Sequence, residues 1–259
     1  MTPISTAQID VVVHNLAAEV DAARQRADRR GWFGAMYLQT TRTVREQVAA
    51  GQFDDGERMC RFVEAFAGRY LAPLQASLEG RPVPRCWAVA FDLARRADKV
   101  ILQHLLLGIN AHVNLDLAVV AAETCPGAEI GSLHDDFMRV NGILGALLPE
   151  VRACIGRFSP LLDVIDRVGG ADDDEILNFS IRVARDEAWS QAQLLAATDD
   201  PARRAQLVDS LDRAVAVLGK VVASPGGLLR RAVDLVAATE SDDVVAVMDA
   251  LGRVTLDSP

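Results

Sequence analysis

The sequence predicts an all-α fold in which several helices form a bundle around one buried central helix. Half of the residues are hydrophobic but only 5% are aromatic, and a chain rich in Ala, Leu and Val favours helices over sheets. Helix start and stop signals recur from end to end, whereas hairpin patterns are absent. The third observation is a stretch near residues 100–122 whose apolar residues point in all directions, as in a helix buried on every side.

Local signals predict four helices in the first hundred residues. A capping box at 5–8 opens a helix that runs to about residue 29, and a second helix covers 32–50 and ends at Gly51. Another capping box at 54–57 starts a helix with large apolar residues at core spacing. The proline-rich segment 81–85 ends that region, and a short helix is expected over 86–98.

The second half of the chain gives the same kind of signals. Beyond the break at 125–127, we expect a helix that begins at Ser132 or Asp135 and bends near Pro149. Further helix starts are predicted at Asp172–Asp174, at Asp200–Pro201 and at Ser241–Asp243. No repeat or low-complexity linker divides the chain, so residues 1–259 are expected to form a single helical domain.

Composition also excludes several classes of function. The net charge of −9 disfavours binding to nucleic acid and to anionic membranes. No C-x-x-C pair is present among the four cysteines, so they are interpreted as buried thiols in a reducing compartment. No secretory signal is seen at the N-terminus, and we expect a cytoplasmic protein. The polar groups within Val100–Ala122 argue against a membrane span.

Those polar groups define the candidate site. A buried polar side chain without a partner costs a few kcal/mol, so each must find a hydrogen-bond partner, a wet cavity or a metal ion. The histidine and aspartate that lie one helical turn apart are the expected catalytic pair, and the two asparagines on roughly the opposite side are expected to bind a ligand. The expected catalytic residues are His112 and Asp116, and the expected substrate-binding residues are Asn110 and Asn114.

A divalent metal ion is one way to satisfy this cluster. His112 and Asp116 would be ligands on one helix, and His104 or Asp135 would complete the set. Gly108, between the two histidines, is expected to leave open space above the helix.

The segment Gly108–Leu117 resembles the central motif of a bacterial family known as a domain of unknown function, DUF5995. Its pattern reads G-x-N-A-H-[IV]-N-x-D-L, and every fixed position is present. The stretches 37–41, 66–70 and 134–141 are also similar to that family, and the likeness covers roughly residues 30–200. The resemblance brings no known activity, but it groups the Asn, His and Asp residues of the central helix.

Three functions fit these observations. The first is a metal-dependent, hydrolase-like enzyme that acts on a small molecule. The second is a metal-free enzyme or binding protein, in which Asp116 orients His112 as a general acid or base and Asn110 and Asn114 hold a polar ligand. The third is a non-catalytic helical protein whose polar network fixes helix packing. Of the three, the sequence favours an enzyme that acts on a small molecule, and it does not set an oligomeric state.

Overall fold

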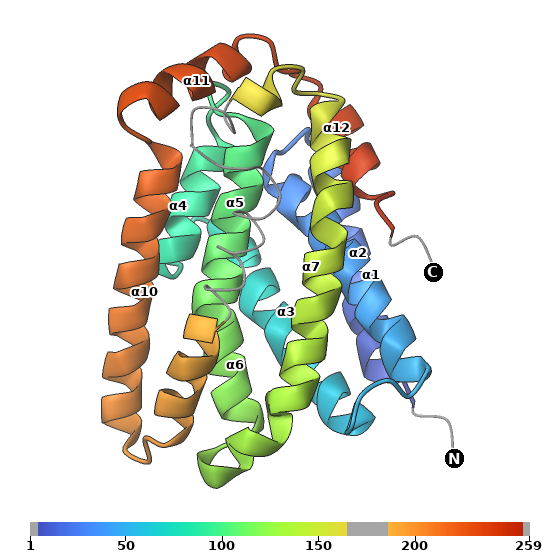
Figure 1. Cartoon of the computed structure of the whole chain (residues 1–259), viewed down its shortest axis with the longest axis vertical. Coiled ribbons are helices and arrows are strands. Elements are labelled where there is room, and N and C mark those ends of the chain that lie inside the picture. The colour runs from blue at the N-terminus through green and yellow to red at the C-terminus, as the bar shows by residue number, and fades with distance from the viewer. Residues whose placement is uncertain (1–4, 165–185, 256–259) are drawn as a thin grey trace.

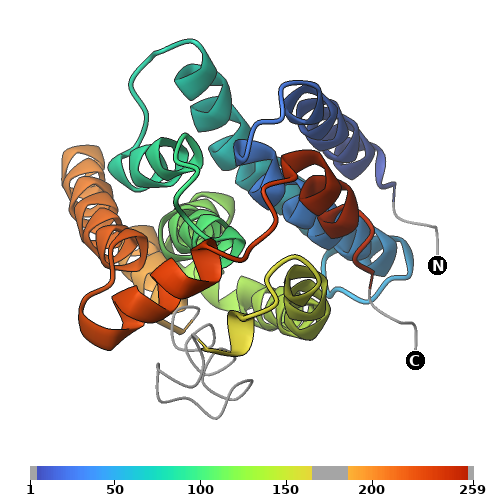
Figure 2. The same ribbon diagram turned by 90° about the horizontal axis from the view of Figure 1, so that it is seen from above.

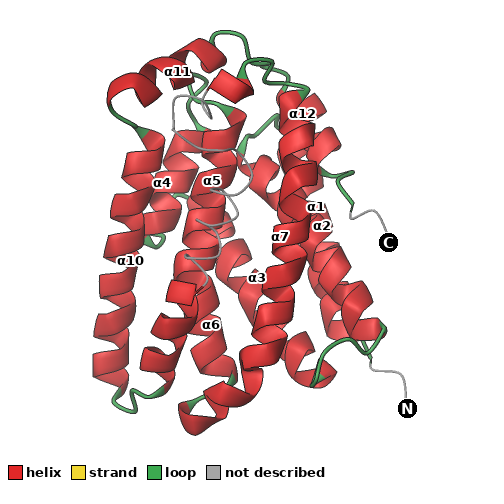
Figure 3. Cartoon of the chain, viewed as in Figure 1, coloured by secondary structure: helices red, strands yellow, loops and turns green. Residues whose placement is uncertain are grey.

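In this computed structural model of the protein, which describes residues 5–164 and 186–255, every regular element is a helix (Figures 1 and 3). The prediction of an all-α fold is therefore confirmed. The helix start predicted at Asp172–Asp174 lies outside the described residues.

The first three helices follow the predicted pattern closely. They are α1 (Ala7–Gln25), α2 (Arg30–Ala49) and α3 (Gly56–Leu78). Asp55 caps α3 by accepting a hydrogen bond from a backbone N–H of its first turn, within the segment 54–57 but one residue after the first position of the expected box. The capping box expected at 5–8 is wrong in detail, because the Thr6 side chain caps no backbone N–H of α1 and donates to a nearby aspartate instead.

The remaining helices complete a bundle around the centre. A 3₁₀ turn precedes α7, which starts at residue 134 and continues through Pro149, and residues 186–196 are also helical. Asp200 and Asp243 cap α10 and α12 as predicted. The elements are α4 (Arg85–Ala94), α5 (Ile101–Ala111), η1 (His112–Asp116), α6 (Leu117–Thr124), η2 (Gly127–Leu133), α7 (His134–Gly156), α10 (Pro201–Ala223), α11 (Gly227–Ala237) and α12 (Val244–Leu251).

Helices α5, η1 and α6 form one continuous rod in the middle of the molecule. Seen end-on, α5 is surrounded by α2, α4, α7 and α10 (Figure 2). Among the described residues, one helical segment, Ile101–Thr124, is long enough and apolar enough to cross a membrane. However, 83% of its most apolar stretch is buried inside the protein. The predicted central position of this helix is confirmed, and its apolar surface is accounted for by contacts with its neighbours.

Carboxylates from distant parts of the chain hold the helices around this rod. Both oxygens of the Asp212 side chain accept backbone N–H groups at the start of α4, at 2.9 Å each. Glu240 accepts the N–H of Ile101, the first residue of α5, at 2.7 Å. Because the first N–H groups of a helix have no partner within it, these contacts fix where the central helices begin.

The space above Gly108 is filled, contrary to expectation. The ring of Phe33, from α2, lies so close that a Cβ atom at position 108 would be 2.4 Å from it. Glycine is therefore required here because α2 packs directly against the backbone of α5.

Candidate functional site

The central rod is interrupted by a π-helical turn where the polar residues lie. Over His112–Asp116 the backbone forms hydrogen bonds to the fifth residue along, so that the N–H of Leu117 donates to the carbonyl of His112. Such turns are rare and are often found at functional sites.

Asp116 is the centre of the polar cluster and has 0% exposure. Its Oδ2 atom accepts hydrogen bonds from Trp87 Nε1 on α4 and from His112 Nδ1, both at 3.0 Å. Its Oδ1 atom lies 3.3 Å from Nε of Arg69 on α3. The carboxylate is thus held by three side-chain donors from three elements, and both of its oxygens are engaged.

This arrangement fixes the chemistry of His112. An ionised carboxylate only accepts hydrogen bonds, so Nδ1 of His112 carries the proton and Nε2 presents a lone pair. Burial lowers the pKa of His112, and Asp116 opposes this shift only in part. The imidazole is therefore neutral at pH 7, and its Nε2 atom has no hydrogen-bond partner among the described residues.

Aromatic rings fix the plane of the imidazole. Phe66, on α3, stacks on it with the ring centroids 3.7 Å apart and the planes 11° from parallel. The ring of Tyr37, on α2, forms a T-shaped contact with the imidazole, with the centroids 4.5 Å apart. Burial raises the pKa of the Tyr37 phenol, so this neighbour stays uncharged.

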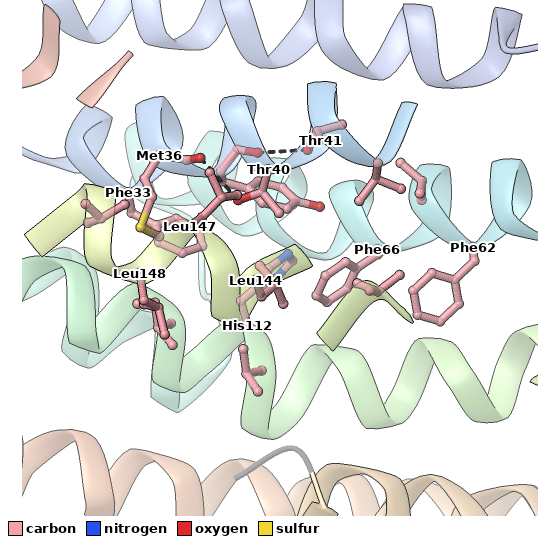
Figure 4. Close-up of a pocket in the computed structure, with 17 residues that line it drawn as sticks. Phe33, Met36, Thr40, Thr41, Phe62, Phe66, His112, Leu144, Leu147 and Leu148 are labelled. Atoms are coloured by element: carbon pink, nitrogen blue, oxygen red, sulfur yellow. Dashed lines mark hydrogen bonds between the residues drawn. The ribbon is translucent and has the colours of Figure 1, made fainter. Parts of the chain in front are cut away.

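His112 lines a cavity of about 70 Å³ between α2, α3, α5 and α7 (Figure 4). Apart from His112 and Tyr37, the polar side chains in its wall are Thr40 and Thr41, which donate to carbonyls of their own helix. The apolar lining residues are Phe33, Met36, Val44, Phe62, Val63, Phe66, Ile109, Val113, Val140, Leu144, Leu147, Leu148 and Val151. A histidine with one ring nitrogen that no described residue contacts by a hydrogen bond thus lines a chamber with almost entirely apolar walls.

The two predicted substrate-binding asparagines lie outside this cavity wall. Asn114 donates to Oδ1 of Asn110 at 2.9 Å, and Asn110 donates to the carbonyl of Val215 on α10 at 3.0 Å. Two turns earlier, Gln103 donates to the carbonyl of Val222 at 2.7 Å. In this structure, Asn110 therefore belongs to a row of contacts that fastens α5 to α10.

The four predicted metal ligands are not brought together. His112 and Asp116 are in contact, but His104 forms a T-shaped ring contact with Trp32, and Asp135 is exposed beside His134. Burial lowers the pKa of His104 to about 4. No group of three or more His, Cys, Asp or Glu side chains within the described residues is arranged to hold a metal ion.

Sequence reasoning missed the partners that hold Asp116. Trp87 and Arg69 are 29 and 47 residues away in the chain. One signal was available for Trp87, because a buried indole N–H almost always needs an acceptor.

Comparison with known proteins gives a family and nothing further. No functionally curated protein and no solved structure matches the chain. A family model described as "Family of unknown function (DUF5995)" matches residues 9–225. The match includes most of α1, then α2 to α7 and the whole of α10, and with them the whole Asp116 cluster and every residue of the cavity wall. The chain therefore belongs to the DUF5995 family.

Proposed function

We propose that the protein binds a small, largely apolar molecule carrying one proton donor, and that His112 accepts that proton in an acid–base reaction. The observation that carries the proposal is a neutral histidine in the wall of an apolar cavity, whose Nε2 atom has no hydrogen-bond partner in the part of the chain that the structure describes. A histidine whose other nitrogen is held by a carboxylate is the usual form of a general base.

The apolar walls determine which ligands would fit. About 10–15 Å³ is enough for one water molecule, but a bound water needs two or more polar partners. The cavity supplies few of these, because the threonine hydroxyls already donate within α2. A hydroxyl or similar group attached to an apolar body satisfies both Nε2 and the walls.

The hydrogen-bond partners of Asp116 favour the hypothesis that this site works without a metal ion. A metal ion needs a free carboxylate oxygen, whereas both oxygens of Asp116 accept N–H groups. The Arg69 guanidinium beside Oδ1 would also repel a dication. The proposal therefore keeps His112 and Asp116 as the catalytic pair without a metal-dependent hydrolase reaction.

A pair of fluorinated probes tests the proposal. Fluorine NMR titrations would compare 4-fluorophenol, which has a hydroxyl, with fluorobenzene, which lacks it. We expect 4-fluorophenol to bind about tenfold more tightly or better, since an unmade hydrogen bond in a buried site costs 1–3 kcal/mol. His112→Phe should abolish this preference, and Asn114→Ala, outside the cavity wall, should keep it. Equal affinity for the two probes, or binding of neither, would refute the proposal and leave a structural role for the cluster.

A further inference from the structure

A second space lies on the other side of the Asp116 cluster, open to solvent. It is a cleft of about 480 Å³ between α3, α6 and α10. Arg69, whose side chain is 30% exposed, belongs both to the cleft wall and to the Asp116 cluster. The other lining residues are Pro84, Leu115, Val119, Glu123, Pro201, Arg204, Ala205, Val208, Asp209 and Asp212.

The two aspartates in this wall are already neutralised. Asp209 is paired with Arg85 at 2.6 Å and with Arg213 at 2.7 Å. Asp212 caps α4 through both of its oxygens. Neither carboxylate is therefore free to attract a cation into the cleft.

Charges of both signs remain. Arg69 donates only through Nε, so its terminal amino groups have no hydrogen-bond partner in the part of the chain that the structure describes. Arg204 uses Nε and one terminal nitrogen on the carbonyl of Thr198, which leaves its other terminal nitrogen available. Glu123 is exposed and forms no hydrogen bond or ion pair with a described residue.

We propose that this cleft binds a small zwitterion of the amino-acid class with an apolar side chain. Guanidinium groups bind carboxylates through parallel hydrogen bonds, so Arg69 and Arg204 would take the carboxylate of the ligand. Glu123 would take its ammonium group. The apolar part would lie against Leu115, Val119 and Val208.

A simple anion or cation fits less well than a zwitterion. An anion would pair with the two arginines but would be repelled by Glu123. A cation would pair with Glu123 but would be repelled by the two arginines. A ligand with both charges pairs with all three groups and brings no net charge into the cleft.

Matched ligands test this assignment on the full chain. The twenty amino acids would first be screened at about 10 mM for an increase in melting temperature, since a ligand that binds only the native state stabilises it. Calorimetric titrations would then compare L-leucine with 4-methylpentanoate, which lacks the amine, and with 3-methylbutylamine, which lacks the carboxylate. We expect both fragments to bind at least about tenfold more weakly than leucine, a difference of about 1.4 kcal/mol.

Surface variants identify the site. Arg204→Gln and Glu123→Gln should each weaken leucine binding about tenfold, whereas Arg203→Gln, one residue along and exposed, should not change it. His112→Phe should leave leucine binding intact, which separates this test from that of the cavity. Failure of every apolar amino acid to bind, equal affinity for leucine and 4-methylpentanoate, or insensitivity to both cleft variants would overturn the proposal.

Discussion

Two buried aspartates, Asp116 and Asp136, occupy similar environments but do different things. Both have 0% exposure, and each lies beside an arginine, Arg69 in one case and Arg58 in the other. Asp136 accepts backbone N–H groups from residues 54 and 55, at 2.7 and 3.2 Å, besides its arginine contacts. Asp116 accepts only side-chain donors.

The donors show what each carboxylate positions. At Asp136, the backbone contacts pin the turn before α3 onto α7, so the carboxylate determines the path of the chain. Burial acts to raise the pKa of Asp136, but its hydrogen bonds outweigh this and hold the pKa below the usual value. At Asp116, the side-chain contacts orient a histidine that lines the cavity and whose second nitrogen has no hydrogen-bond partner among the described residues. A buried carboxylate is therefore better judged by its donors than by its burial.

The largest expected effect is loss of the backbone-binding carboxylate. Asp136→Ala leaves the Arg58 guanidinium and two backbone N–H groups without their acceptor, and should lower the free energy of unfolding by about 3–5 kcal/mol. Urea denaturation would measure the change. Asp135→Ala is the control, because that neighbour is exposed and should change stability by no more than about 0.5 kcal/mol. Equal effects of the two variants would contradict the role assigned to Asp136.

As the pH falls, the cost of keeping His104 unprotonated should lower the stability of the protein before protonation of Asp136 does. The pKa of His104 is about 4 in the folded protein against an ordinary value of 6.5. Between these values the unfolded chain binds the proton and the folded chain does not, so stability is complete above pH 6.5 and falls as the pH decreases toward 4. The free energy of unfolding should fall by about 3 kcal/mol because of His104. Urea denaturation measured between pH 6.5 and 4 should show this pH dependence in the wild type and not in His104→Phe. Asp136, with a depressed pKa, should contribute its loss only below about pH 4. A pH profile that is unchanged in His104→Phe would contradict this expectation.

Asp116→Asn should separate the contact with Arg69 from the orientation of His112. The amide oxygen keeps both hydrogen bonds of Oδ2, from Trp87 and His112, when the N–H₂ group takes the place of Oδ1. That group cannot accept from Nε of Arg69, so we expect a stability loss of about 1–3 kcal/mol. The imidazole proton should stay on Nδ1 in the ¹⁵N NMR spectrum of the ring, and the 4-fluorophenol preference should persist, whereas a proton on Nε2 would contradict the assigned role of Asp116. Asp136→Asn is the comparison variant, and its His112 spectrum should match that of the wild type.

The smallest effect on stability is expected from the hydrogen bonds that link α5 to α10. Asn114→Ala removes the hydrogen bond to Asn110 and should cost about 0.5–1.5 kcal/mol. Because Asn114 lies outside the cavity wall, the ¹⁵N spectrum of His112 should not change. A changed tautomer in this variant would show that the two polar groups on the helix are coupled.

The sequence predicted what depends on near neighbours in the chain. Helix caps at Asp55, Asp200 and Asp243, and the His112–Asp116 contact one turn apart, follow from short spacings that an isolated helix already contains. The burial of the central helix followed from its apolar residues on all sides.

What could not be predicted depends on packing between distant segments. The acceptor of the Trp87 indole, the contact of Arg69 with Asp116 and the filling of the Gly108 space by Phe33 are set by how α2, α3 and α4 meet the central rod. Glycine at position 108 gave no indication of which side chain would approach it. The cavity, likewise, is formed by four helices and by no single stretch of sequence.

The π turn makes the length of the central segment as important as its composition. A turn with one additional residue rotates everything beyond it by about 100° relative to an uninterrupted α-helix. Residues 117–122 are all buried, so in a chain of this length each side chain of α6 faces its present neighbours only because of the π turn. Deleting a single residue such as Val113 would restore regular winding and leave α6 facing its present neighbours, but it would reduce the spacing of His112 and Asp116 from four residues to three. The insertion of a further residue would instead rotate α6 by about 100° against the wrong partners, so the apolar core should tolerate a deletion here better than an insertion.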